Sequence, residues 1–271
     1  MPINNFAREV LEQTSRTFFT PIIRLPNELQ EVVAASYLSL RAIDEIEDHS
    51  QLDKIDKVLL LNGISQKVQE LSIGTTHDPF TELFKPYRDM LPSVTLSIND
   101  WLRFSPKSVA PRLWDTTAAM ASRMAYWAKS NWKIDTQIDL DHYTFNVAGA
   151  VGLLLCDIWA WYDGTQTDRV HAIGFGRALQ AVNILRNRQQ DLRRGVDFFP
   201  DNWTRIDMQR YARANLKIAK KYIQALPNGA VRNFCTVPFS LAHATLNTIE
   251  SGHEKLSRED VYEIIQNLDI E

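Results

Sequence analysis

The feature that most constrains this chain is the stretch of residues 40–49, which reads LRAIDEIEDH. Four carboxylates fall within five residues, with an isoleucine between them, whereas a fully solvated acidic face gains nothing from apolar side chains. In a helix, Asp44 and Asp48 stand one turn apart on the same side as Tyr37 and Arg41. Like charges at this spacing repel, so a divalent cation held by carboxylate oxygens is the expected compensation. Because an acidic cluster alone is more often solvated surface than a site, other parts of the chain must decide.

The composition is that of an ordinary globular protein. With 271 residues, 45% of them hydrophobic and 23% charged, the chain can bury a sizeable core. A net charge of -3 offers no basic field, which argues against a nucleic-acid partner. Cys156 and Cys235 form no CxxC pair and indicate a reducing compartment. The N-terminus shows no signal-peptide pattern, and the most apolar window, residues 147–160, is shorter than the roughly 20 residues that span a bilayer. We therefore expect a soluble, cytoplasmic protein.

Apolar residues recur at helical spacing along the whole chain, and no run shows the strict alternation of a half-buried strand. The pattern predicts an all-α fold. The expected helices cover residues 5–18, 26–49, 53–72, 79–104 with breaks at Pro86 and Pro92, 113–132, 139–162, 168–191, 206–226, 230–251 and 258–267. Because no low-complexity linker or repeat divides the chain, a single domain over residues 1–271 is favoured over two.

A second polar stripe runs along the predicted helix of residues 168–191. Gln180, Asn183, Asn187 and Asp191 recur at steps of three, four and four, and apolar residues occupy the other side. An exposed face is the simpler explanation. Alternatively, the acidic and the amide-rich stripes face each other across a bundle, as in helical proteins that build metal sites in their interior. Apolar walls beside such a polar mouth would suit a hydrocarbon tail joined to a diphosphate. The candidate wall residues are Phe18, Phe19, Leu40, Phe145, Val147, Val151 and Leu154.

Four blocks of the sequence resemble the squalene and phytoene synthase family, in that family's order. Residues 14–18 and 37–48 resemble the first aspartate-rich motif and the flap before it, and residues 143–152 resemble the family's tyrosine- and glycine-rich helix segment. Residues 183–191, followed by Gly195 and residues 198–200, resemble the second motif, and residues 234–246 are similar to a late helix of squalene synthases. Any one block would be a weak signal, whereas four in order make a strong one.

The resemblance implies an all-α isoprenoid (terpenoid) synthase bundle around a central hydrophobic cavity. In such a fold, Mg²⁺ held by aspartates ionises an allylic prenyl diphosphate. By motif match, the implied metal ligands are Asp44, Asp48, Asn187 and Asp191, and the implied catalytic residues are Tyr143, Asp44 and Asp48. The other implied substrate-binding residues are Ser15, Thr17, Phe18, Tyr37, Arg41, Val147, Gly152, Gln180, Asn183 and Arg186, with Arg41 and Arg186 as the diphosphate contacts.

The second motif departs from the family's pattern. Asn187 stands where the family has an aspartate, Gln190 replaces an acid, and Val196 replaces an arginine. An amide oxygen brings no charge, so metal affinity at this motif should fall. With farnesyl diphosphate as the favoured substrate, several chemistries stay open: condensation to a squalene or phytoene type product, transfer or cyclisation of one prenyl unit, and hydrolysis to a prenyl alcohol. A non-catalytic lipid-binding homologue and a peripheral membrane contact for product release are also left open, and the sequence does not indicate an oligomeric state.

Overall fold

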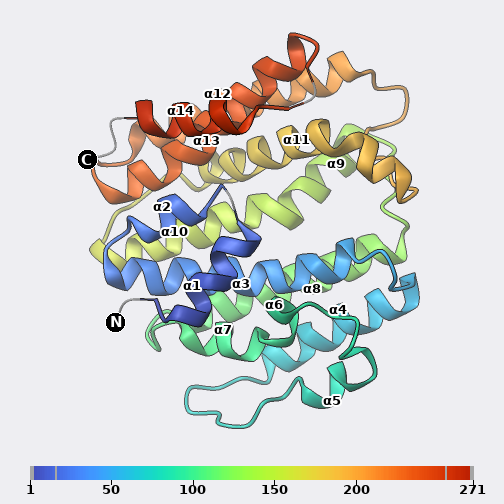
Figure 1. Ribbon diagram of the computed structural model, residues 1–271, viewed down its shortest axis with the longest axis vertical. Coiled ribbons are helices and arrows are strands. Elements are labelled where there is room, and N and C mark those ends of the chain that lie inside the picture. The colour runs from blue at the N-terminus through green and yellow to red at the C-terminus, as the bar shows by residue number, and fades with distance from the viewer. Residues whose placement is uncertain (1–2, 16, 254, 269–271) are drawn as a thin grey trace. The chain divides into compact units, whose positions relative to one another are not determined.

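The computed structural model describes residues 3–15, 17–253 and 255–268, and within these ranges the chain forms helices and no strand (Figure 1). The all-α expectation is confirmed. Contacts between residues group the chain into two compact units. The N-terminal unit comprises Met1–Ile22 and Pro26–Asn131, and the C-terminal unit comprises Ile23–Leu25 and Trp132–Glu271. The single domain expected over residues 1–271 stays a prediction.

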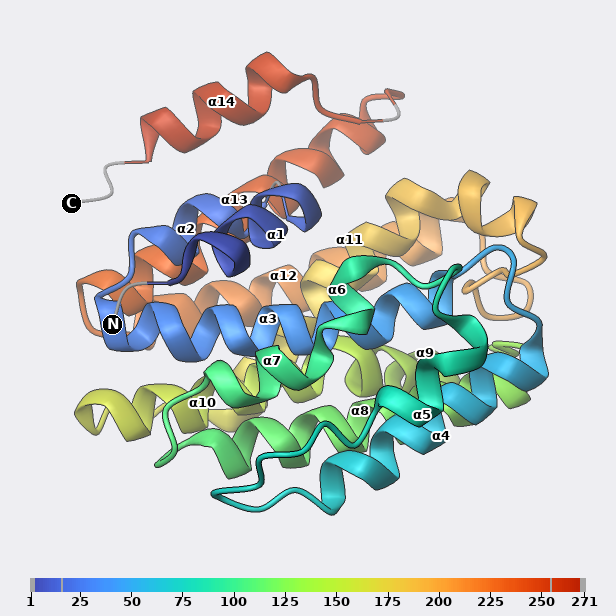
Figure 2. The same cartoon turned by 60° about the horizontal axis from the view of Figure 1, so that its bottom comes forward.

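Helix α3 is the centre of the N-terminal unit. It contacts α1, α4, α6, α7 and α8, and α4 and α8 pack side by side (Figure 2). Leu38, Ile43 and Ile46 on α3 are fully buried, and each such burial stabilises the fold by about 1.5–3 kcal/mol. The elements of this unit are α1 (Asn5–Thr14), α2 (Phe19–Ile23), α3 (Asn27–Asp48), α4 (Lys54–Gln69), α5 (Thr81–Phe84), η1 (Lys85–Tyr87), α6 (Ser93–Leu96), α7 (Ile98–Phe104) and α8 (Ala110–Lys129).

The predicted first helix, residues 5–18, is wrong in extent. Helix α1 ends at Thr14 because Ser15 takes an extended conformation, with φ -138° and ψ 98°. The Ser15 hydroxyl then accepts a hydrogen bond from the Phe18 N–H at 2.8 Å, and the chain restarts as α2. A serine that bonds nearby backbone in this way competes with helix continuation.

The segment of residues 79–104 is more broken than expected. It holds α5, the 3₁₀ helix η1, α6 and α7, because Pro86 lies in η1 and Pro92 precedes α6. The predicted helix of residues 113–132 starts earlier, at Ala110, since a proline is tolerated in a first helical turn. It also ends earlier, because Asn131 and Trp132 adopt positive φ values of 56° and 50°.

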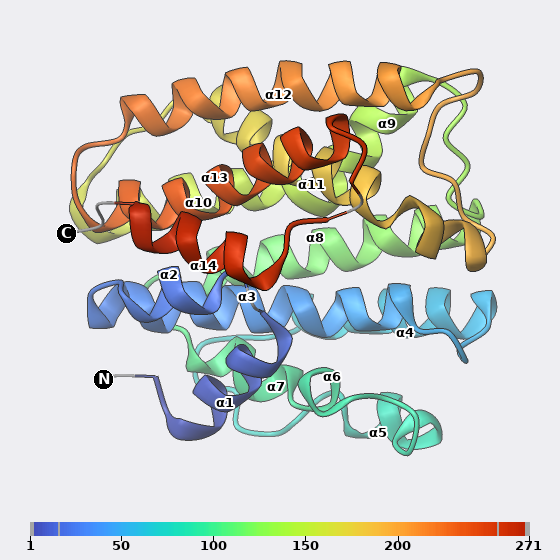
Figure 3. The same ribbon diagram turned by 45° about the horizontal axis from the view of Figure 1, so that its top comes forward.

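Helix α11 is the centre of the C-terminal unit, and it contacts α9, η2, α10, α12 and α13 (Figure 3). Two glycines make this packing close: a Cβ on Gly152 would lie 2.1 Å from the Ala172 carbonyl oxygen, and one on Gly176 would lie 2.1 Å from that of Ala148. Only glycine permits such an approach of backbones. The elements are α9 (Gln137–Thr144), η2 (Phe145–Gly149), α10 (Ala150–Asp163), α11 (Arg169–Arg193), α12 (Arg205–Ala225), α13 (Ala230–Glu250) and α14 (Arg258–Asn267).

The predicted helix of residues 139–162 is longer than expected and contains a π-helical turn, η2. The whole stretch Gln137–Asp163 is long and apolar enough to cross a membrane by length and composition, and half of its apolar window is buried within the protein. The apolar window of residues 147–160 underestimated the length of this helical stretch, because helical turns continue on both sides of the window. This is weak evidence for a membrane span, since buried core helices of soluble proteins share the same property.

Candidate functional site

Tyr37, Arg41, Asp44 and Asp48, which we call the acidic half-site, share one side of α3. Arg41 donates from Nη1 to Asp44 Oδ2 at 2.5 Å and from Nη2 to the carboxylate of Glu45. The Asp44 side chain is half-buried and Asp48 is exposed. The acidic half-site therefore presents two aspartates one helical turn apart, as the spacing predicted.

The four acids of this stretch do not point the same way. Glu47 is only 4% exposed and faces the interior of the N-terminal unit, where its backbone carbonyl accepts a hydrogen bond from Lys57 Nζ at 2.7 Å. The sequence placed only Asp44 and Asp48 on the side of Tyr37 and Arg41, and the burial of Glu47 is compatible with that. Glu47 lies on the core side because a helix turns about 100° per residue.

Burial and the neighbouring carboxylates shift the pKa of Arg41 in opposite directions. Burial favours the neutral form, but the charges of Asp44 and Glu45 outweigh it, so the pKa of Arg41 is raised above its ordinary value. Its Nε is buried and has no hydrogen-bond partner among the residues that the structure describes. The charge of the guanidinium is thus compensated by two carboxylates, and the Nε donor left unsatisfied within the described ranges is buried.

The residues of the flap meet next to Tyr37. The Tyr37 hydroxyl donates to the Thr14 carbonyl at 2.8 Å, and the Phe18 ring lies 5.8 Å from the Tyr37 ring. Burial raises the pKa of Tyr37 although Ser15 hydrogen-bonds its hydroxyl. Ser15, Phe18 and Tyr37 are therefore brought together, and Thr17 is half-buried beside them. Arg16, which belongs to the same motif, lies outside the described residues.

Gln180, Asn183, Arg186 and Asn187, which we call the amide half-site, lie along α11. Asn183 Oδ1 accepts hydrogen bonds from Asn187 Nδ2 at 3.0 Å and from Arg186 Nη2 at 2.6 Å. Arg186 Nε donates to Asn187 Oδ1 at 3.1 Å. The middle of the predicted polar stripe, Asn183 and Asn187, is therefore joined by hydrogen bonds through Arg186 and directly. That this stripe faces the acidic half-site stays a prediction.

Arg186 differs from Arg41 in the partners it has. The side chain reaches solvent, yet enough protein surrounds the guanidinium to lower its pKa by desolvation. No carboxylate pairs with it in the described part of the chain. An arginine held by neutral amides retains its full charge for an anionic ligand.

Asp191, the acid of the second motif, forms an ion pair with Arg194 at the end of α11. It is 7% exposed, and its Oδ1 accepts from Arg194 Nη2 at 2.6 Å. Its carbonyl accepts from the N–H of Val196 at 3.1 Å across Gly195, whose φ is +78°. This left-handed glycine ends the helix in a Schellman motif. Asp191 stays a predicted ligand, which would have to exchange its ion pair with Arg194 to bind a metal.

Tyr143 is buried, with 4% of its surface exposed, and its ring stacks on that of Phe198 at 4.5 Å and 20°. Phe198 comes from the loop after α11. Val147 lies half-exposed on η2, and Gly152 lies in the contact with α11. Single π-helical turns are frequent at functional sites. The sequence analysis missed this turn because one residue inserted into a helix leaves the apolar pattern almost unchanged.

The described residues contain no group of three or more His, Cys, Asp or Glu side chains that could hold a metal ion. The acidic half-site alone nevertheless fits Mg²⁺, which keeps several waters and uses one or two carboxylates. In the amide half-site the amide oxygens already accept hydrogen bonds from Arg186 and Asn187. The donor set therefore suits a magnesium ion held chiefly by Asp44 and Asp48.

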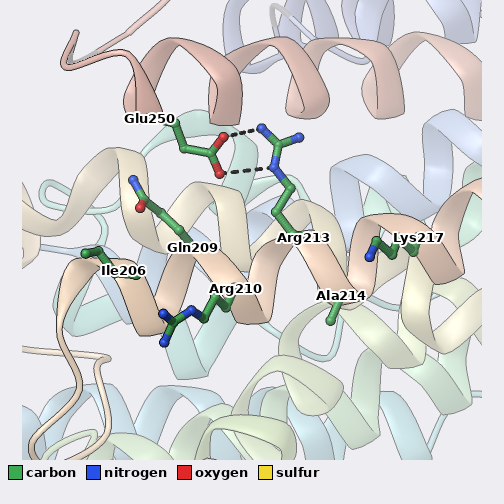
Figure 4. Close-up of a pocket in the computed structure, with 7 residues that line it drawn as sticks. All are labelled: Ile206, Gln209, Arg210, Arg213, Ala214, Lys217 and Glu250. Atoms are coloured by element: carbon green, nitrogen blue, oxygen red, sulfur yellow. Dashed lines mark hydrogen bonds and ion pairs between the residues drawn. The ribbon is translucent and has the colours of Figure 1, made fainter.

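Two hollows on the surface are lined by residues outside both half-sites. A groove of about 520 Å³ runs along α12 and α13, where Arg213 Nε donates to Glu250 at 3.0 Å (Figure 4). A smaller hollow of about 270 Å³ lies on α4 and α8. Neither is lined by any predicted site residue, so the expected central cavity stays a prediction. The residues that line the larger groove are Ile206, Gln209, Arg210, Arg213, Ala214, Lys217 and Glu250.

Comparison with known proteins gives consistent matches. The family model of squalene/phytoene synthase matches residues 11–210. Squalene synthase of Schizosaccharomyces pombe is 27% identical over 272 residues, which cover 89% of this chain and 58% of that protein. Squalene synthase of Rattus norvegicus is 26% identical over 275 residues, which cover 90% of this chain and 63% of that protein. Two solved structures of TcSQS with bound ligands match with TM-scores of 0.75 and 0.78 at 22% identity, covering 96% of this chain and 84% of theirs.

These matches establish the family and the fold. The chain spans about three fifths of the length of the curated relatives it matches. The solved structures show the all-α isoprenoid synthase fold, and the family model covers most of the chain, including both polar stripes and the segment of Tyr143. The chain therefore belongs to the squalene/phytoene synthase family.

Proposed function

We propose that this protein is a transferase that ionises a prenyl diphosphate with the help of Mg²⁺ and transfers or condenses the prenyl group. The observation that carries the proposal is the family match over residues 11–210, which spans both half-sites. The relatives that are squalene synthases support a head-to-head condensation. Farnesyl diphosphate is the substrate we propose, because the resemblance to the squalene and phytoene synthase family favours it.

The acidic half-site would hold the metal. Asp44 and Asp48 supply hard oxygen ligands, and Mg²⁺ bound there acts as a Lewis acid on the diphosphate. Arg41 stabilises the carboxylates of Asp44 and Glu45 in the absence of ligand. When a metal ion takes over Asp44, the guanidinium would be released to donate to a diphosphate oxygen.

The amide half-site would bind the departing diphosphate directly. Arg186 carries a charge that only amide oxygens contact, so an incoming phosphate oxygen meets no competing carboxylate on it. Asn183 and Asn187 fix the direction of the guanidinium. Tyr143, held by its stack on Phe198, offers an aromatic face that attracts a cation and excludes water from it.

The second candidate is hydrolysis or single-substrate cyclisation on the same fold. The observation that favours it is the loss of acids at Asn187 and Gln190, which weakens a second metal site. A phosphatase releases orthophosphate, whereas ionisation releases diphosphate. The phosphorus product therefore separates hydrolysis from the other reactions, and the prenyl product separates cyclisation from condensation.

The test is incubation of the purified protein with farnesyl diphosphate, with and without Mg²⁺. Phosphorus NMR and extraction of the prenyl products follow the reaction. We expect Mg²⁺-dependent release of diphosphate together with a prenyl product longer than the substrate. Orthophosphate with farnesol would replace the proposal by hydrolysis, diphosphate with a cyclic or single-unit product would support cyclisation, and unaltered substrate would favour a non-catalytic lipid-binding protein.

A further inference from the structure

A polar cluster outside both half-sites joins three helices of the C-terminal unit. Its members are Asp141 and Thr144 of α9, Arg177 of α11 and Tyr211 of α12, and we call it the Asp141 cluster. The Tyr211 hydroxyl donates to Asp141 Oδ1 at 2.8 Å, and the Thr144 and Tyr211 hydroxyl oxygens lie 3.2 Å apart. Arg177 Nη2 donates to the Asp141 carbonyl at 3.0 Å, and its Nη1 lies 3.6 Å from Asp141 Oδ1.

Two members of the cluster are withdrawn from water, whereas the side chains of Arg177 and Asp141 are 26% and 32% exposed. Thr144 is fully buried, Tyr211 is 7% exposed, and Arg177 has a buried Nε without a partner among the described residues. Burial raises the pKa of Tyr211, so its hydroxyl stays a donor at any physiological pH. Such a buried polar network is costly unless its hydrogen bonds are made, so its geometry is well defined.

The cluster stands where the helix changes from α to π. Thr144 is the last residue of α9, and η2 begins at Phe145. The Phe145 N–H is shared between the carbonyls of Asp141 and His142. A π-turn shifts the backbone hydrogen bonds by one residue and so perturbs the regular helical ladder at the junction. Two carbonyls just before it also accept side-chain hydrogen bonds, Asp141 from Arg177 and Leu140 from the Thr144 hydroxyl at 2.7 Å.

In the sequence, Tyr143 lies between two members of the Asp141 cluster, Asp141 and Thr144. We infer that Tyr211 and Arg177 are positioning residues, which hold the junction of α9 and η2 and so orient the Tyr143 ring and the exposed side of η2 toward the substrate. The part that concerns the substrate rests on the proposed function, and the part that concerns the junction does not. Neither residue touches the reacting atoms in this assignment.

Helix α12 offers a matched control in Tyr222. It is 1% exposed, and its hydroxyl accepts from Trp159 Nε1 at 3.0 Å, away from the junction. Tyr211→Phe and Tyr222→Phe therefore each remove one buried hydroxyl from the same helix and keep the ring. A purely structural role of Tyr211 predicts the same consequences for both variants.

The test measures kcat and KM for farnesyl diphosphate, together with amide hydrogen exchange over η2, in the full chain. For Tyr211→Phe we expect kcat to fall about tenfold with KM changed less than about twofold, and exchange of the η2 amides to rise about tenfold. Tyr222→Phe should change neither. Equal kcat and equal η2 exchange in the two variants would overturn the inference.

Arg177 gives a second measurement that does not depend on Tyr211. Arg177→Lys keeps a donor for the Asp141 carbonyl and should retain most of the protection of η2, whereas Arg177→Met should lose it. Equal exchange in these two variants would contradict the role of Arg177. If the wild-type protein fails to turn over any prenyl diphosphate, the proposed function fails, while the exchange measurements still decide whether the cluster holds the junction.

Discussion

The acidic half-site and the amide half-site each contain one arginine, Arg41 and Arg186, and their environments shift the two pKa values in opposite directions. Both are partly desolvated, which lowers the pKa. For Arg41 the carboxylates of Asp44 and Glu45 reverse the effect, whereas Arg186 has only the amide oxygens of Asn183 and Asn187. The two pKa values shift in opposite directions because Arg41 has carboxylate neighbours and Arg186 has amide neighbours.

This contrast indicates a division of labour between the half-sites. The acidic half-site is a charge-compensated pair that can exchange its arginine for a metal ion, because carboxylates prefer a divalent cation when one is present. The amide half-site cannot compensate a cation and is therefore suited to an anion. On the proposed function, the acidic half-site would therefore bind the metal and the amide half-site the diphosphate.

The largest effect is expected for Asp44→Ala. Loss of a metal ligand should reduce Mg²⁺-dependent turnover by about a hundredfold or more. Asp191→Ala is the comparison, and it should cost much less if Asp191 serves chiefly as the partner of Arg194. Steady-state kinetics against Mg²⁺ concentration measure both. Full activity of Asp44→Ala, or equal losses in the two variants, would break the division of labour.

The next largest effect is expected for Arg186→Met. Removal of a charge-assisted bond worth roughly 1.5–3 kcal/mol should raise KM for the prenyl diphosphate about tenfold to a hundredfold. Inhibition by inorganic diphosphate should weaken in parallel, because the lost contact is to phosphate and not to the hydrocarbon tail. Arg188→Met is a control on the same helix, since Arg188 pairs with Asp197 at 2.8 Å. An unchanged KM in Arg186→Met would remove the diphosphate role of the amide half-site.

Asn187→Asp tests whether a charge can convert the amide half-site into a metal-binding one. The new carboxylate should lower the Mg²⁺ concentration for half-maximal turnover about threefold to tenfold. Gln189→Asp adds the same charge to another face of α11 and should change it little. If the two variants have the same metal dependence, Asn187 does not face the metal.

The smallest effect concerns stability and provides the baseline for pH profiles. Thr136 and Thr204 cap α9 and α12, and their hydrogen bonds lower the pKa of Asp139 and Asp207 below the ordinary 3.8. A lowered pKa stabilises the fold above the ordinary value, and this contribution is lost as the pH falls through the lower folded value. We expect a constant thermal midpoint from pH 7 to about 5 and a decline below about 4, measured by circular dichroism.

Thr204→Val is the check on that baseline, because it removes the hydroxyl bond and should make the acid decline shallower. A thermal midpoint that already falls near pH 6 would contradict the expectation. If the midpoint is constant, a loss of turnover between pH 7 and 5 belongs to the half-sites and not to unfolding, which keeps the comparison of Arg41 and Arg186 interpretable.

Local signals predicted most of the helices. The bounds of α14 coincide with those expected, and α3 was predicted to within a residue or two, because Pro26 and Glu28 mark its start. The polar stripe on α11 was predicted from spacing alone, and two of its members, Asn183 and Asn187, hydrogen-bond to each other. In each case residues three or four apart carry the information, so a straight helix suffices to place them.

Other features were missed because their signals lie outside helical periodicity. The break after Thr14 comes with a local bond from the Phe18 N–H to the Ser15 hydroxyl, and the residues just before the π-turn contact Arg177 and Tyr211 of other helices. The role of Gly152 emerges only where α10 meets α11. Periodicity cannot reveal such features, because it describes one helix at a time.

The sequence by itself determined the helical class, the family resemblance and which side of α3 and of α11 carries polar groups. Only the tertiary structure decided which charged side chains are buried, which are paired and how their pKa values shift. Glu47 points into the core, Asp191 is paired with Arg194, and Arg41 and Arg186 carry opposite pKa shifts. The physical reason is that a charge's energy depends on its burial and on the groups within a few ångströms, and helix packing determines both.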